Sequence, residues 1–96
     1  FETVDVVLMP VFGTAAFAHF EAGARKPRML RIDDADTPYE AQGAWSTFAS
    51  FTGLPVTVAP VGRGTEGMPI GVQIVGPFLH DRTTLAVARW LEAHLK

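Results

Sequence analysis

"LPVTVAPVGRGTEGMPIGVQIVG", residues 54–76, decides the fold because it holds two apolar runs on either side of a glycine-rich centre. β-branched and apolar residues fill Val56–Ala59 and Ile70–Val75, which is the composition of strands. No helical pattern separates the two runs. Strands joined without a helix most simply pair antiparallel, so this stretch predicts a hairpin.

The centre of the hairpin also spells G-x-G-x-x-G, with Gly62, Gly64 and Gly67. A dinucleotide-binding loop with this spacing must open a helix whose N-terminal amides face the pyrophosphate. Here Met68, Pro69 and a strand follow instead. We therefore interpret the glycines as turn residues and expect no nucleotide cofactor.

A strand and a helix are predicted upstream of the hairpin. Thr3–Pro10 is almost continuously apolar, which favours a central strand buried on both faces. The loop 11–36 follows. A helix is then expected, with Thr37 and Glu40 as a capping box at its start and Gly53 just past its end. Its apolar stripe would be Ala41, Trp45, Phe48 and Thr52, and another face would carry Glu40, Gly43 and Thr47.

Downstream, Asp81 is expected to cap a last helix over 82–95. The predicted order is strand, loop, helix, strand, strand, helix, which indicates an α/β fold with a mixed β-sheet flanked by helices on both faces. These elements are too few for a complete sandwich. The chain also begins at Phe1 rather than methionine, so we expect residues 1–96 to be a single C-terminal segment of a larger domain.

Composition narrows the classes of function. The net charge of −2 gives no field for nucleic acid or an anionic membrane, and there is no cysteine for a disulfide or thiolate metal site. Because no cysteine ties the chain to an oxidising compartment, we expect a cytoplasmic protein. No apolar run is long enough to span a membrane. The only basic cluster comprises Arg25, Lys26, Arg28 and Arg31; nearby aspartates favour a solvated loop over an anion site.

Local motifs do not predict a catalytic centre. His19, His80 and His94 lack metal-ligand spacing, and no metal or other cofactor is expected. Ser46 and Ser50 fall inside the predicted helix rather than on a strained turn. Gln73 is unusual because a buried amide must find partners; it either faces a pocket or, as we favour, bonds to nearby backbone.

Several motifs together resemble the C-terminal end of the amidase signature family. They are "DVVLMP", "FTGLPVTVAPVG" and "GMPIGVQIVGPFLHDRTTLAVARWLE", in this order. The resemblance covers nearly the whole chain except the loop 11–36. Two positions depart from the family pattern: Val11 stands where threonine is common, and Ser50 where asparagine is common.

The resemblance implies a hydrolase of carboxamide C–N bonds that uses a Ser-cisSer-Lys triad and an acyl-enzyme. None of those catalytic residues maps onto this chain, so they would lie upstream and the 96 residues alone would be inactive. The substrate would be a small-molecule amide. The helix before Gly-Leu-Pro often walls the acyl pocket, so Glu40, Gly43 and Thr47 are the expected substrate contacts.

Two other hypotheses stay open. The apolar composition and the incomplete sheet would also suit a non-catalytic module that forms a homo-oligomer through exposed sheet edges. The family also includes the A subunit of tRNA-dependent amidotransferases, and nothing in the sequence selects or rejects that branch.

Overall fold

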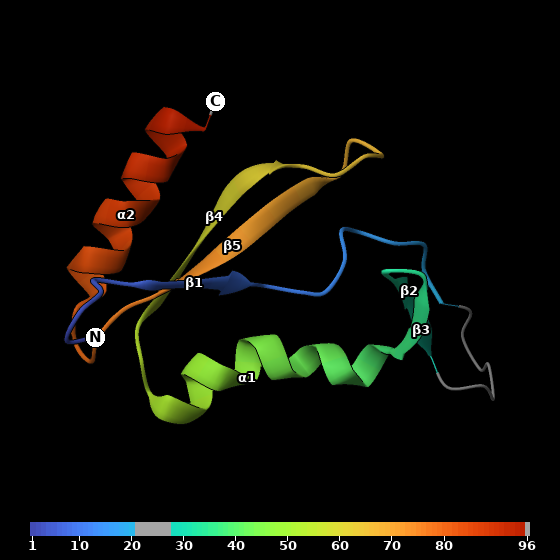
Figure 1. Ribbon diagram of the computed structural model, residues 1–96, viewed down its shortest axis with the longest axis horizontal. Coiled ribbons are helices and arrows are strands. Elements are labelled where there is room, and N and C mark those ends of the chain that lie inside the picture. The colour runs from blue at the N-terminus through green and yellow to red at the C-terminus, as the bar shows by residue number, and fades with distance from the viewer. Residues whose placement is uncertain (21–27, 96) are drawn as a thin grey trace.

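The computed structural model describes residues 1–20 and 28–95. Its two helices, three-stranded sheet and two-stranded hairpin confirm a mixed α/β chain (Figure 1). The elements in chain order are β1 (Val7–Pro10), β2 (Met29–Ile32), β3 (Ala35–Pro38), the 3-10 helix η1 (Tyr39–Gln42), α1 (Gly43–Thr52), β4 (Val56–Arg63), β5 (Pro69–Val75) and α2 (Asp81–His94).

The antiparallel β4–β5 hairpin is confirmed and forms most of the main sheet, whose strand order is β1-β5-β4. In the turn, the amide of Gly64 donates to the carbonyl of Met68 at 2.8 Å, and Gly67 takes a positive φ of 80°, which favours glycine. The strand register shifts between Pro60 and Gly62, which places a β-bulge in β4. All strand pairings among the described residues are antiparallel, so the mixed β-sheet expected from the sequence is wrong for this part of the chain.

The strand expected at the centre of the sheet lies at its edge. Among the described strands β1 pairs only with β5, and it spans Val7–Pro10 rather than starting at Thr3. Its Leu8 side chain is exposed. Continuous hydrophobicity indicates that both faces of a strand become covered, but it does not say how many neighbours the strand has.

Helix α2 covers one face of the main sheet. Leu91 packs with Ala59 and Ile74 to form the buried core. The sequence led us to expect Asp81 as the cap of this helix, and this is wrong. Asp81 is the first helical residue, and His80 before it makes no side-chain cap bond. The acidic side chain still suits the positive end of the helix dipole.

Helix α1 lies on the other side of the sheet (Figure 1). The expected capping box is wrong. Thr37 belongs to β3, where it pairs with Leu30, and its hydroxyl donates to the carbonyl of Ala35 at 3.5 Å. The residue expected to cap the helix is therefore part of the β2–β3 hairpin, and α1 begins later, at Gly43. Its predicted end is confirmed by Gly53, in the left-handed region at φ 70°.

The β2–β3 hairpin also occupies part of the loop 11–36, of which 21–27 lie outside the described residues. Helix α1 does not bury the broad apolar face expected of it. Ala49 is its only buried residue, whereas Phe48 and Phe51 are 48% and 88% exposed. Within the described part of the chain, this apolar face is covered only in part.

The core predicts a clear difference between two substitutions. Ile74→Ala should lower the free energy of unfolding by about 2–5 kcal/mol, because it leaves a cavity where the side chain is fully buried. Thr65→Ala, in the exposed turn, should change it by less than about 0.5 kcal/mol. Urea unfolding followed by circular dichroism measures both, and equal losses would contradict the assigned core.

Candidate functional site

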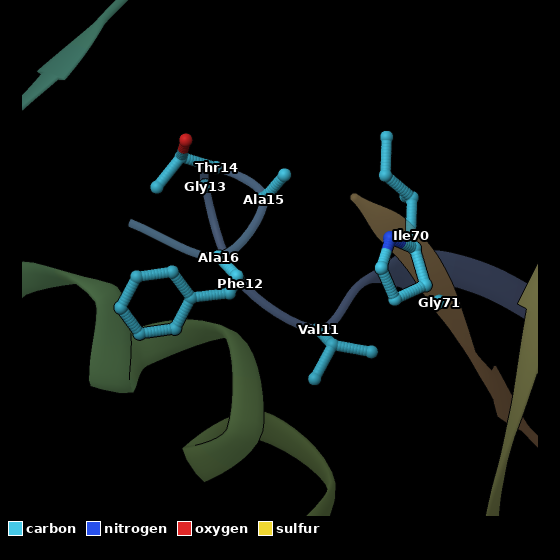
Figure 2. Close-up of a pocket in the computed structure, with 9 residues that line it drawn as sticks. Val11, Phe12, Gly13, Thr14, Ala15, Ala16, Ile70 and Gly71 are labelled. Atoms are coloured by element: carbon cyan, nitrogen blue, oxygen red, sulfur yellow. The ribbon is translucent and has the colours of Figure 1, made fainter. Parts of the chain in front are cut away.

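A hollow of about 300 Å³ lies between the loop that follows β1 and the start of β5. Figure 2 shows the loop passing beside Ile70 and Gly71, with the Phe12 ring next to the helical ribbon. The lining residues are Val11, Phe12, Gly13, Thr14, Ala15, Ala16, Pro69, Ile70 and Gly71. Thr14 supplies the only side-chain hydroxyl among them, so the hollow suits apolar contact rather than acid–base chemistry.

Gln73 connects three parts of the chain near this hollow. Its side chain is 4% exposed, and its Nε2 donates to the carbonyls of Pro10 at 2.7 Å and Trp45 at 2.9 Å. Both amide hydrogens therefore bond to backbone, which agrees with the structural role we favoured. The bonds tie β5 to the end of β1 and to α1.

Gln42 is a second buried amide, and sequence reasoning missed it. It is 5% exposed, and its Oε1 accepts a hydrogen bond from the Gly13 amide at 2.9 Å. A side chain at Gly13 would overlap this oxygen and the Cδ1 atom of Ile32, so glycine allows the close approach without a shift of either side chain. The spacing of seven residues between Gln42 and Ala49, two helical turns, was the signal that could have identified it as inward-facing.

Aromatic rings join the loop that lines the hollow to the start of η1. Neighbouring centroids in this group lie 5.6–6.1 Å apart, which is typical of aromatic pairs. The guanidinium of Arg28 sits 4.3 Å from the centroid of the Tyr39 ring. The rings are Phe12, Phe17, Phe20 and Tyr39; the phenylalanines have no periodic spacing, so no sequence pattern groups them.

Arg28 also forms an ion pair with Glu40, with 2.8 Å between Nη2 and Oε1. The hydrogen bond from Arg28, followed by one from the backbone amide of Glu40, lowers the pKa of the Glu40 carboxyl below its ordinary value. Arg31 pairs with Asp36 at 3.3 Å. Both described members of the basic cluster therefore have carboxylate partners; the other two lie outside the described residues.

The residues predicted to contact substrate lie in η1 (Glu40) and in the first half of α1 (Gly43 and Thr47), outside the hollow. Glu40 is held by Arg28, and the Thr47 hydroxyl donates to the carbonyl of Gly43 at 2.6 Å. The space that a side chain would take at Gly43 is empty to 4 Å. All three residues are exposed, and their contact with substrate stays a prediction.

The described residues show no grouping suited to catalysis. The hydroxyls of Ser46 and Ser50 donate to carbonyls of their own helix, at 3.2 Å in both cases. Across residues 1–20 and 28–95, no cluster of histidines and carboxylates is arranged to hold a metal ion. The helices in that part of the chain are also too short or too polar to cross a membrane.

The Arg28–Glu40 pair predicts a specific titration. Arg28→Met should raise the pKa of Glu40 toward its ordinary value, whereas Arg31→Met should leave it unchanged. Because folding lowers this pKa, the pair's contribution to stability is present above the unfolded-state pKa and is lost as the pH falls through the folded value. Carbon-13 NMR of the carboxyl group measures the shift, and identical titration in both variants would contradict the assignment.

Comparison with known proteins places the chain. The amidase family model matches residues 1–85. The A subunit of glutamyl-tRNA(Gln) amidotransferase from Rhodospirillum rubrum is 37% identical over 92 residues, which are 96% of this chain and 16% of that protein. Fatty-acid amide hydrolase 2 of Homo sapiens is 50% identical over 50 residues, 51% of this chain and 9% of that protein. The chain thus spans a small part of its curated relatives, and it belongs to the amidase family.

Proposed function

We propose that residues 1–96 form the C-terminal segment of a hydrolase that cleaves carboxamide C–N bonds. The observation that carries this proposal is the family match over residues 1–85. By resemblance, a Ser-cisSer-Lys triad upstream of these residues forms the acyl-enzyme. The segment supplies strands, helices and one wall of the pocket for a small-molecule amide. The proposed location of the protein is the cytoplasm.

The exposed apolar residues support a segment that is covered by more protein. Phe51 on α1 and Leu79 before α2 are 88% and 76% exposed, which is unusual for large apolar side chains. Both outer strands of the main sheet also have an unpaired edge among the described residues. A larger mixed sheet, with further strands beside β1 or β4, would bury these surfaces.

The amidotransferase branch is a second candidate for the complete protein. The similarity to the amidotransferase A subunit extends over 96% of this chain, whereas that to human fatty-acid amide hydrolase 2 is higher but covers 51%. In that case the complete protein would work with partner subunits and tRNA. Assays of amide hydrolysis separate the branches, because a free amidase turns over simple amides without partners.

The proposal predicts where activity resides. The 96-residue chain alone should hydrolyse neither an aryl nor an aliphatic amide, because the triad is upstream. The complete natural polypeptide that carries these residues should release ammonia or amine from such amides, measured by a coupled ammonia assay or by chromatography. Turnover by the pure chain would contradict the placement of the triad, and no turnover by the complete polypeptide, with or without partner subunits, would contradict the function.

The predicted pocket wall can be tested at Gly43, where a side chain has room. Gly43→Leu in the complete protein should raise KM for amides at least about tenfold by filling the pocket, a difference of about 1.4 kcal/mol, without loss of stability. Ala44→Leu, on the next exposed position of α1, is the matched control. Equal KM values for the wild type and both variants would remove Gly43 from the wall.

A self-associating module is the alternative of a different class, and the open sheet edges favour it. Light scattering of the 96-residue chain at rising concentration distinguishes this module from a segment of a larger hydrolase. Because its apolar surfaces lack their cover, we expect the chain to associate without a fixed stoichiometry. A discrete, folded dimer would instead support the interaction module. A folded monomer at high concentration would contradict both hypotheses, because each expects apolar surfaces that drive association.

A further inference from the structure

Both glutamines of the sequence are buried, and both bond to the backbone of one short segment. Gln73 donates to the carbonyl of Pro10, just before the loop that lines the hollow, and Gln42 accepts from the amide of Gly13 within it. One amide comes from the middle strand β5 and the other from η1, just before α1. The loop is therefore held from two sides by elements that are distant in sequence.

We propose that Gln42 and Gln73 are positioning residues that fix the loop Val11–Ala16 and thereby set the shape of the hollow it lines. Gln73 also bonds to the carbonyl of Trp45, so the same pair fixes the start of α1 relative to the loop. That part of α1 carries Gly43 and Thr47. The part of α1 that is proposed to face substrate is thus held against the loop; this link to substrate rests on the proposed function.

The two amides act with opposite polarity. Gln42 uses its oxygen as an acceptor, whereas Gln73 uses its nitrogen to donate twice. A glutamate at position 42 keeps the acceptor, but a glutamate at position 73 places an oxygen against two carbonyl oxygens. A residue that only filled space would not distinguish these substitutions, because glutamine and glutamate have nearly the same size.

The first test measures hydrogen exchange by mass spectrometry in the complete natural polypeptide. Gln42→Met and Gln73→Met keep the side-chain volume and should speed exchange in peptides covering residues 11–16 by about threefold to tenfold, the effect of one lost hydrogen bond. Gln42→Glu should exchange more slowly than Gln42→Met, whereas Gln73→Glu should exchange at least as fast as Gln73→Met. Arg82→Met on the outer face of α2 is the control and should leave the loop unchanged.

A second experiment tests the contact between Gly13 and Gln42 by changing the loop residue instead of the glutamine. Gly13→Ala should speed exchange because the added methyl group overlaps the Gln42 oxygen. Adding Gln42→Ala removes that overlap and leaves only the Cδ1 atom of Ile32, 2.9 Å from the added methyl group, so Gly13→Ala should speed exchange less in the Gln42→Ala background than in the wild type. Strictly additive effects would overturn the direct contact, as would unchanged exchange in both Met variants.

The link to substrate is tested by steady-state kinetics with aryl and aliphatic amides. The Met variants should raise KM about tenfold and change kcat less than about twofold, because the triad lies elsewhere. Faster loop exchange with unchanged KM would overturn the link while the proposed function stands. A wild-type polypeptide that hydrolyses no amide would instead remove the proposed function, and hydrogen exchange alone would then decide whether the glutamines position the loop.

Discussion

A primary amide on a buried strand has two hydrogens that need acceptors, and Gln73 places both on backbone carbonyls of other elements. Each hydrogen left without a partner in such a place would cost about 1–3 kcal/mol. This requirement limits where the end of β1 and the start of α1 can lie relative to β5. These hydrogen bonds position the loop and the hollow. The apolar core cannot do so, because it lies on the opposite face of the sheet, under α2.

The parts of the fold that follow from local chemistry could be predicted from the sequence. The hairpin followed from two apolar runs around glycines, and the end of α1 followed from Gly53, because left-handed backbone favours glycine wherever it occurs. The start of α1 could not be predicted in the same way. Thr37 and Pro38 suit a helix start and a strand end equally well, and the pairing with β2 decided between them. The position of β1 at the edge was likewise set by pairing partners and not by its own residues.

The candidate site was predictable only in part. Gln73 could be recognised because a polar residue interrupts an apolar strand, whereas only the spacing from Ala49 marks Gln42, whose immediate neighbours are small. The aromatic group is harder still, because Phe12 and Tyr39 are brought together by the path of a long loop. Contacts between residues so distant in sequence depend on the whole arrangement, and no periodicity in either segment records them.

The β-bulge at Pro60 and Gly62 has a consequence for how the sheet could grow. Proline lacks the amide that a neighbouring strand would bond to, and the register shift turns the following residues out of line. The free edge of β4 is thereby divided into two short stretches. An incoming strand that entered at Val56 would lose its pairing after a few residues, so the bulge limits the length of any strand that adds beside β4.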